Sequence, residues 1–362
     1  MKHIIIGLIF MTLCFAAPNK TITADNKLIE YTGRIDFSDV KAPKFSYSGV
    51  SIRACFTGTS IAIIMDDNVG ENIYNILIDG ELLDTLHITK GKKTYKIAEG
   101  LSDKIHEIEV FKRTEEMFGK TQFYGFILDE NASLVEIRNK RTKLVEYIGD
   151  SITCGYGNEG EYEVDEFGNT TENHYMTYAA ITSRNFNARH IAVCKSGIGV
   201  YRNWDGPKEG NDDNMTNFYP RIFLWDDEPK YDFAETPDLI CINLGSNDFS
   251  TIGGDSTLYT DNYLRLIDTL QSKYKNPEIL CLLGPLISGE NLPKVRNILK
   301  NIVDISNKKN KGKVSFFEMS TQTGDLGIGV DYHPSSAQHQ RNAQELSEHI
   351  ATLKDWKIIL KK

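Results

Sequence analysis

The first part of the chain, from about residue 27 to residue 128, consists of short apolar runs separated by turn residues. The runs are rich in Ile, Tyr and Phe, and turns recur about every eight to twelve positions, which is typical of antiparallel β-sandwiches. Asp79-Gly80 favours a tight hairpin, because both residues accept positive φ angles. We therefore predict a sandwich of jelly-roll type. The expected strands are SIRACFTG (51–58), TSIAIIMDD (59–67), YNILIDGELLDTLHI (74–88, a hairpin), KTYKIAEG (93–100), HEIEVFKRT (106–114) and TQFYGFILDE (121–130).

Beyond Leu144 the pattern changes, and apolar runs of strand length alternate with amphipathic segments of helical length. Near-continuous apolar strands that alternate with helices indicate a parallel sheet covered on both faces. We therefore predict a three-layer α/β domain. The expected strands are LVEYI (144–148), RHIAVC (189–194), DLICINL (238–244), EILCLLG (278–284) and VSFFEM (314–319), and the expected helices lie within 176–186, 261–274 and 293–308.

This change of pattern divides the chain into two domains. A length of 362 residues exceeds what one hydrophobic core usually serves. We expect the sandwich at 27–130, a polar connection at 131–142 and the α/β domain at 143–362.

The N-terminus has the outline of a secretory signal peptide at 1–16, with a basic start, a short apolar run and small residues at its end. The run is shorter than the roughly 20 residues of a membrane-spanning helix. Leu13 before Cys14 does not fit a lipid-anchor signal, because a small residue is expected there. We expect a secreted or periplasmic protein.

Charge narrows the possible partners. The formal net charge is −9, and Lys and Arg are spread along the chain instead of forming a basic stretch. We therefore expect neither nucleic acid nor an anionic membrane as a partner, and a neutral or weakly charged substrate fits better.

The cysteines do not suggest a disulfide framework. Six are present, and removal of Cys14 with the signal peptide would leave an odd number without paired spacing. Cys241 and Cys281 fall inside strand-like runs, where a thiol usually behaves as a small buried hydrophobic group.

Polar clusters follow the predicted parallel strands. Gly149-Asp150-Ser151 follows the first, Ser196-Gly197 the second and Gly245-Ser246-Asn247-Asp248 the third, and Asp331-Tyr332-His333-Pro334 precedes the last helix. Sites in such sheets form at the carboxyl ends of the strands. We expect these four clusters to meet at one edge of the sheet.

The residue types match nucleophilic catalysis. A serine hydroxyl needs a base within hydrogen-bond reach and donors for the developing oxyanion. Ser151 at a strand-to-helix turn is our candidate nucleophile, and its own amide is one donor. The Gly197 amide and the Asn247 side chain are the other candidate donors. His333 is the candidate base, and Asp331 would orient its imidazole.

These four blocks, in this order, resemble the SGNH (GDSL-type) hydrolases over residues 143–355. With the preceding sandwich, the short blocks GDSITCGYG and DYHPS resemble carbohydrate esterase family two, whose members remove acetyl groups from xylan and glucomannan. The resemblance implies a flavodoxin-like parallel sheet in the α/β domain. It also implies a serine esterase that acts through an acyl-enzyme on acetylated polysaccharide or oligosaccharide.

The sequence departs from the common SGNH pattern at one point. The usual Asp-x-x-His would place the acid at position 330, where this chain has Val330. The acid is one residue nearer to His333, at Asp331. Similar esterases imply two alternatives: Asp331 orients the histidine, or a backbone carbonyl does.

Plainer explanations exist for several of these residues. Ser151 could be a helix cap, and Asn247 and Asp248 could serve only loop structure, a role we expect for Asp248. Gly199 is an alternative to Gly197, and either glycine could serve only to permit the turn. His174 and His190 rival His333 as the base, but we expect them at the surface, as we do His339 and His349. His87 and His106 belong to the sandwich.

Tyr332 and Trp204 are our candidate substrate-binding residues, because aromatic rings pack against the C–H faces of sugars. We expect no metal and no cofactor, since the sequence has no His-Glu-x-x-His, paired Cys-x-x-Cys or phosphate-loop motif.

We therefore predict an esterase that deacetylates plant cell-wall polysaccharide. Two alternatives stay open: a lipase or thioesterase acting on other esters, and a glycan-binding protein with a subsidiary hydrolase domain. The sequence does not indicate the oligomeric state.

Overall fold

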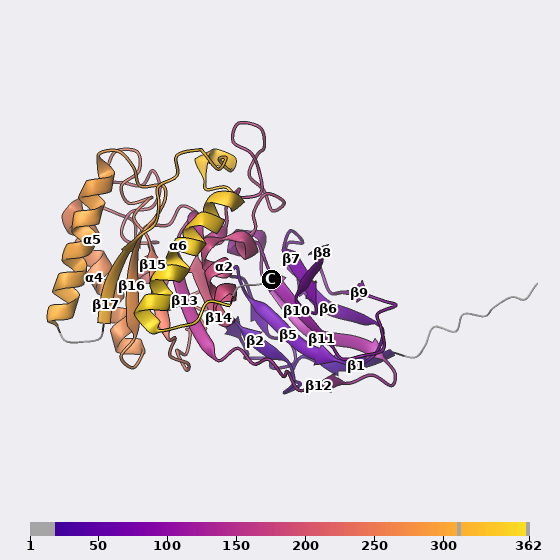
Figure 1. Cartoon of the computed structure of the whole chain (residues 1–362). Coiled ribbons are helices and arrows are strands. Elements are labelled where there is room, and N and C mark those ends of the chain that lie inside the picture. Colours follow the sequence, from indigo (N-terminus) through magenta and orange to yellow (C-terminus); the bar gives the residue numbers. More distant parts are fainter. Residues whose placement is uncertain (1–18, 310–312, 360–362) are drawn as a thin grey trace, which may run out of the picture.

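A computed structural model describes residues 19–309 and 313–359. Figure 1 shows two domains side by side, a β-sandwich from the first part of the chain and an α/β domain from the rest. The predicted signal peptide at 1–16 lies outside the described residues. Within the described ranges, none of the helices combines the length and the apolar character that a membrane crossing needs.

The sandwich consists of two antiparallel six-stranded sheets. Side chains along a strand point alternately to its two faces, and one face of each sheet contributes to the core. In β6 (Ile61–Asp67), every second side chain is buried. The first sheet contains β1 (Asn19–Thr23), β3 (Ile35–Asp36), β4 (Lys44–Phe45), β6, β9 (Lys93–Ala98) and β11 (Thr121–Asp129). The second contains β2 (Glu30–Thr32), β5 (Ser51–Phe56), β7 (Ile73–Ile78), β8 (Glu81–His87), β10 (His106–Lys112) and β12 (Leu134–Val135).

The predicted hairpin at Asp79-Gly80 is confirmed. It joins β7 and β8, and both residues have positive φ angles, 56° and 84°. The domain bounds differ from the prediction at two places. β1 begins at Asn19, and β12 lies inside the expected connection at 131–142, where it pairs with β5.

The α/β domain has a five-stranded parallel sheet in the order β14-β13-β15-β16-β17. In this doubly wound order the first strand, β13, lies between the second and the third, and the strand order reverses beside it. All five side chains of β15 are buried, as expected for a strand covered on both faces. The strands are β13 (Lys143–Gly149), β14 (Ala188–Cys194), β15 (Leu239–Asn243), β16 (Glu278–Leu283) and β17 (Lys313–Glu318).

Helices cover both faces of this sheet (Figure 1). The helices α4 (Ser256–Lys273) and α5 (Asn291–Lys308) pack on one face, and α2 (Tyr178–Asn185) and α6 (Ser336–Lys354) on the other. Side-chain caps define where the long helices begin: Asp255 accepts two backbone N–H groups of α4, and Ser335 accepts one of α6. The short helices are η1 (Glu116–Phe118), α1 (Ser151–Cys154), η2 (His174–Met176), α3 (Met215–Phe218) and η3 (Val330–Tyr332).

The expectation for the cysteines is confirmed for the described residues. Cys241 and Cys281 are fully buried in strands, and both are free thiols. Burial in an apolar sheet raises the pKa of Cys281 to about 12, which keeps the thiol neutral.

The expected surface positions of His174, His190 and His339 are wrong. All three are buried, and each ring contacts other residues inside the protein. His174 and His190 approach within 3.0 Å through their Nε2 atoms, and Phe111 of the sandwich stacks on the His174 ring. His339 accepts the backbone N–H of Tyr178 through Nδ1. His349 is half-buried on α6 against Phe317.

A buried ion pair connects the two domains. Arg34, after β2, reaches Glu146 in the middle of β13 with an N–O distance of 3.1 Å, and both side chains have no solvent exposure. The guanidinium lies over the rings of Tyr219 and Tyr231, at 4.4 and 4.5 Å from their centroids. The sandwich therefore packs against the sheet that carries the functional site.

Candidate active site

Ser151 occupies an abrupt turn between β13 and α1. Gly149 leaves space for this turn, because a Cβ there would come within 2.0 Å of the Thr153 hydroxyl oxygen. The neighbouring Asp150, not Ser151, is the N-cap of α1, and its Oδ1 accepts the backbone N–H of Ile152 at 3.0 Å. The Ser151 hydroxyl is therefore not used for capping.

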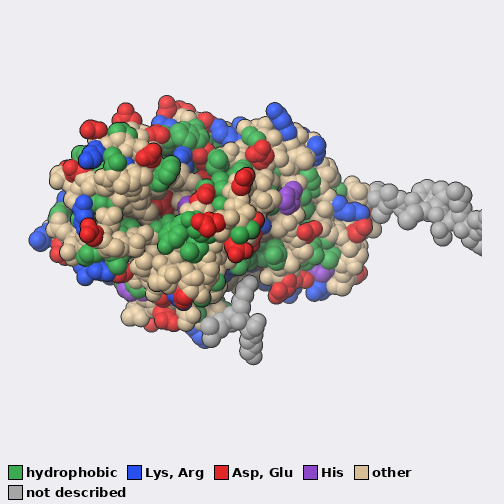
Figure 2. Space-filling model, turned by 90° about the horizontal axis from the view of Figure 1, so that it is seen from above, with side chains coloured by type: hydrophobic (Ala, Val, Ile, Leu, Met, Phe, Trp, Pro, Cys, Tyr) green, Lys and Arg blue, Asp and Glu red, His purple; other side chains and the backbone are tan. Residues whose placement is uncertain are grey.

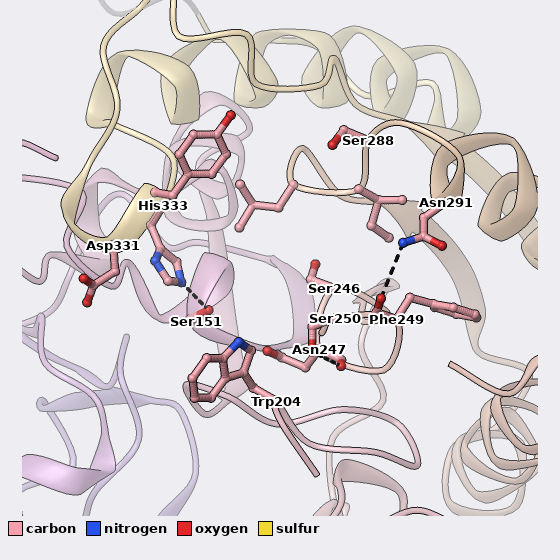
Figure 3. A pocket seen from close by; sticks show the side chains of 13 residues that line it. Ser151, Trp204, Ser246, Asn247, Phe249, Ser250, Ser288, Asn291, Asp331 and His333 are labelled. Carbon is pink, nitrogen blue, oxygen red and sulfur yellow. Dashed lines mark hydrogen bonds between the residues drawn. The ribbon is translucent and has the colours of Figure 1, made fainter. Parts of the chain in front are cut away.

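Ser151 and His333 meet, although 182 positions separate them in the chain. The distance between Ser151 Oγ and His333 Nε2 is 2.8 Å, and Figure 3 shows this contact at the base of the cavity. A base at this distance can accept the serine proton during attack on a carbonyl.

A backbone carbonyl orients the imidazole. His333 Nδ1 lies 3.2 Å from the Val330 carbonyl oxygen. Since a carbonyl can only accept, Nδ1 carries the proton, and Nε2 is left free to accept from Ser151. This geometry matches the second of the two alternatives for the partner of His333.

Asp331 has a different partner. Its carboxylate accepts the hydroxyl of Tyr156 at 2.6 Å and points away from His333 in Figure 3. The backbone explains this direction: Asp331 and Tyr332 have left-handed φ angles of 50° and 66°, so the turn brings the Val330 carbonyl to the imidazole. The Tyr156 ring also packs on His333, with 4.2 Å between the ring centroids.

The site keeps His333 in its basic form. Burial lowers the pKa of His333 below the usual value of histidine, although the carbonyls of Val330 and Asp331 and the charge of Asp331 oppose the shift. An imidazole that is neutral at pH 7 can act as a general base without first losing a proton.

Two backbone N–H groups are available to an oxyanion. Neither the amide of Ser151 nor that of Gly197 donates a hydrogen bond to any of the residues that the structure describes. Gly197 has a φ of 78°, and a Cβ there would meet only the Cβ of Trp204, at 3.9 Å, so this position faces open space. Ser151 and Gly197 line the same cavity as His333.

Asn247 also lines the cavity, but its amide group has partners. Its Nδ2 donates to the Ile198 carbonyl at 2.9 Å and lies 3.4 Å from Asp150 Oδ2. The oxyanion role of Asn247 therefore stays a prediction. Asp248 has the structural role expected of it, because its carboxylate accepts the backbone N–H groups of Val200, Tyr201 and Arg202.

The cavity has two lobes that meet at Ser151, with volumes of about 300 and 480 Å³. Trp204 borders both lobes and Tyr332 borders one, and these side chains are 62% and 52% exposed. Figure 2 shows a hollow in this face of the α/β domain with acidic side chains around it. Both predicted substrate-binding residues therefore lie at the rim of the site.

Several lining residues were not among the predicted ones. Leu286, Ile287 and Asn291 come from the segment after β16, and Phe249 from the segment after Asp248. The rule that sites form at the carboxyl ends of strands also applies to β16, so that rule could have identified them.

One group of buried side chains is of the type that binds metals. Glu115, Cys154 and Glu172 each place a possible ligand atom within 4.8 Å of the others. The Glu115 oxygens already accept hydrogen bonds from Ser196, and burial raises the pKa of Glu172 well above its usual value. Because the Glu115 oxygens are engaged in these hydrogen bonds, the three residues fit a hydrogen-bond network better than a metal site.

Comparison with known proteins agrees with the two-domain arrangement. The model of the carbohydrate esterase 2 N-terminal domain matches residues 31–137, and that of the GDSL-like lipase/acylhydrolase family matches residues 147–356.

Individual relatives cover both domains. The cellulase/esterase CelE of Acetivibrio thermocellus is 36% identical over 94% of the chain, which spans 41% of the length of that protein. An acetylxylan esterase/glucomannan deacetylase of Cellvibrio japonicus is 26% identical, with 97% of each chain covered. A solved structure of a family two carbohydrate esterase from Clostridium thermocellum, in complex with cellohexaose, aligns with a TM-score of 0.85 and 36% identity over 91% of this chain and 99% of the other.

Proposed function

The chain belongs to the GDSL-like lipase/acylhydrolases and, within them, to carbohydrate esterase family two, and from this premise we propose that it removes O-acetyl groups from plant cell-wall polysaccharides such as xylan and glucomannan, or from their oligosaccharides. The observation that carries the proposal is the 2.8 Å contact between Ser151 and His333 beside two unused backbone N–H groups. A binding protein has no need of this combination.

In the proposed reaction, the Ser151 hydroxyl attacks the acetyl carbonyl carbon while His333 Nε2 accepts its proton. The amides of Ser151 and Gly197 stabilise the oxyanion, and Asn247 joins them if its amide reorients. Collapse of the tetrahedral intermediate breaks the ester bond, and His333 returns the proton to the departing sugar hydroxyl. Water, activated by the same imidazole, then releases acetate from the acyl-enzyme.

The cavity supports a sugar ester as substrate. Trp204 and Tyr332 offer exposed ring faces at its rim, and Ser246, Ser288 and Asn291 add polar groups to its wall. Sugars need both apolar faces and hydrogen-bonding groups from a binding site. We propose that Trp204 and Tyr332 contact the sugar rings that carry or flank the acetyl group.

Two further parts of the proposal rest on other observations. The sandwich order β4-β11-β6-β9 facing β5-β10-β7-β8, with the chain crossing repeatedly between the sheets, supports a jelly-roll connection. The basic and apolar start of the sequence supports export to the periplasm or the medium.

The test is acetate release from acetylated xylan and acetylated glucomannan by wild type and Ser151→Ala. We expect the variant to lose at least about 10³-fold in kcat, because no other group in the proposed mechanism forms the acyl-enzyme. Ser272→Ala, an exposed serine on α4, is the control and should release acetate at the wild-type rate. Survival of most turnover in Ser151→Ala would refute the proposed nucleophile.

The lipase or thioesterase alternative predicts a different chain-length preference. Rates with 4-nitrophenyl acetate, butyrate and octanoate separate the two, since an acetyl esterase should lose activity as the acyl chain lengthens. A maximum at octanoate would favour the alternative.

A further inference from the structure

The sandwich domain reaches the active site through one buried carboxylate. Glu115 follows β10 and is 1% exposed. Its Oε2 accepts the backbone N–H of Ser196 at 2.8 Å, and its Oε1 accepts the Ser196 hydroxyl. The Glu115 main chain is anchored in turn, because its N–H donates to Glu172 Oε2 at 3.2 Å.

Ser196 belongs to the loop 195–198, which carries the Gly197 amide. The other backbone N–H groups of this loop donate to Gly149, Glu115 and the Lys195 carbonyl. Its carbonyls accept from the backbone N–H groups of Ile198 and Trp204 and from the side chains of Lys195 and Asn247. Among the described residues, the Gly197 N–H is thus the one backbone polar group of the loop without a partner. A loop with every other group paired holds this N–H in one direction.

The direction follows from the peptide between Ser196 and Gly197. In a trans peptide, the N–H points opposite to the preceding carbonyl. The Ser196 carbonyl accepts from the Lys195 ammonium group at 3.0 Å, so it is held on the side away from the Gly197 N–H. The Glu115 carboxylate accepts hydrogen bonds from the N–H and the hydroxyl of Ser196. The Lys195 contact acts on this peptide directly, whereas the Glu115 contacts restrain Ser196 on the N-terminal side of its Cα.

Glu115 also contacts the nucleophile helix. The thiol of Cys154, the last residue of α1, lies 3.7 Å from Glu115 Oε2. One carboxylate therefore touches both segments that present a candidate oxyanion donor: α1, which begins with the Ser151 amide, and the loop with the Gly197 amide.

We infer that Glu115 of the sandwich domain is a positioning residue for the oxyanion site, which holds the Gly197 amide in line with the Ser151 amide. The inference rests on the proposed function. Glu115 does not line the cavity and acts through Ser196 and Cys154. It gives the sandwich domain a part in the reaction besides any contact with glycan.

A carboxylate suits this position better than its amide isostere. Its two oxygens accept from an N–H and an O–H at the same time. In Glu115→Gln one of these oxygens becomes an NH₂ group, which cannot accept. The remaining oxygen can accept the Ser196 N–H, but the Ser196 hydroxyl must then turn to accept from the NH₂ group. The variant keeps the size of the side chain but loses the negative charge that strengthens both contacts, so it holds Ser196 less firmly.

The test measures kcat and KM of Glu115→Gln on acetylated glucomannan and on 4-nitrophenyl acetate. We expect kcat to fall by about 10- to 100-fold, since a small misplacement of catalytic groups has costs of this size, with KM changed less than about twofold. The factor should be the same for both substrates, because the oxyanion forms on the acetyl group that they share. Damage to the sugar-binding cleft would instead affect the polysaccharide more.

The matched control is Glu109→Gln, at another buried glutamate of the sandwich. Glu109 pairs with Arg141 at 2.6 Å and also accepts from Ser51, away from the Ser196 loop. We expect this variant to melt at a lower temperature than wild type but to keep its kcat. Equal losses of kcat in both glutamate variants would overturn the inference, because they would show only general destabilisation.

A second variant keeps the inference testable if Glu115→Gln does not fold. Ser196→Ala removes the hydroxyl contact and leaves the N–H contact, so kcat should also fall, by more than about twofold. A kcat for Ser196→Ala within about twofold of wild type would overturn the inference. If Ser151→Ala loses acetate release but Glu115→Gln keeps full activity, the inference about Glu115 is overturned and the proposed function stands. If Ser151→Ala keeps its activity, the proposed function is refuted.

Discussion

At the residue scale, the proposed catalytic base His333 depends on a backbone carbonyl for its orientation. The Val330 carbonyl lies 3.2 Å from His333 Nδ1, while Asp331 is paired with Tyr156. A carbonyl fixes the tautomer as well as a carboxylate does, but it brings no full charge to the imidazolium that forms during the reaction. The Asp331 charge acts on His333 only through space.

This arrangement predicts unequal effects of two substitutions. Asp331→Asn should lower kcat/KM by about tenfold or less, whereas His333→Ala should lower it by at least about 10³-fold. Replacement of an aspartate that holds the catalytic histidine of a full triad costs about 10⁴-fold. Acetate release by the two variants is the measurement, and equal losses would argue for a full triad.

The pH dependence is a second prediction at this scale. The neutral imidazole is the active form. The value of kcat/KM should therefore be high above the pKa of His333 and should decrease as the pH falls through this pKa. Because burial lowers this pKa, the acidic limb should have its midpoint below the ordinary histidine value of roughly 6.5.

The pH profile of Asp331→Asn provides the check on that interpretation. The Asp331 charge raises the pKa of His333, so its removal should move the acidic limb to a still lower pH. A limb that moves to higher pH would contradict the assignment of this limb to His333.

At the element scale, the turn from β13 to α1 decides where the proposed nucleophile Ser151 lies. The strand ends at Gly149 and the helix begins at Ser151, so only Asp150 separates them. This turn tolerates no side chain at Gly149, because the Thr153 Oγ1 and Cβ atoms would lie 2.0 and 2.8 Å from a Cβ there.

Gly149→Ala should therefore reduce stability and activity together. Overpacking of this kind costs about 1–3 kcal/mol of unfolding free energy, and relief of the clash moves α1 and with it Ser151. Gly168→Ala is the control, since a Cβ at Gly168 would have no neighbour within 4 Å. Urea unfolding and acetate release measure the two effects, and a stable Gly149→Ala with full activity would contradict this account of the turn.

At the scale of the whole molecule, the two domains share buried polar contacts. Arg34 and Glu146 form a fully buried pair, and His174 and His190 lie against Phe111 of the sandwich. Glu115 extends the same interface to the Ser196 loop. Buried charges require partners, so these contacts specify one arrangement of the domains.

Arg34→Met should lower the free energy of unfolding by about 3–5 kcal/mol, because it leaves Glu146 buried without its partner. The double variant Arg34→Met/Glu146→Leu should recover part of this loss. Lys96→Met is the control, because Lys96 and Glu99 form an exposed pair and such pairs contribute about 0–1 kcal/mol. Chemical denaturation measures all three, and an Arg34→Met as stable as Lys96→Met would refute the structural role of the pair.

The sequence by itself determined the elements and the edge at which they build a site. Alternation with a period of two predicts β6, and near-continuous apolar runs predict β15, because each pattern reflects which faces of a strand are buried. The carboxyl ends of parallel strands lie at one edge, so Ser151, Gly197 and Asn247 could be placed together before their distances were known.

The tertiary structure alone decided which partner each polar group has. The left-handed φ angle of Asp331 turns its carboxylate to Tyr156 and leaves the Val330 carbonyl for His333. The same holds for His174, which looked like a surface residue but is buried at the domain interface. Local pattern reports which side of an element faces the core, whereas hydrogen bonds depend on backbone angles and on contacts between distant segments, and neither has a period in the sequence.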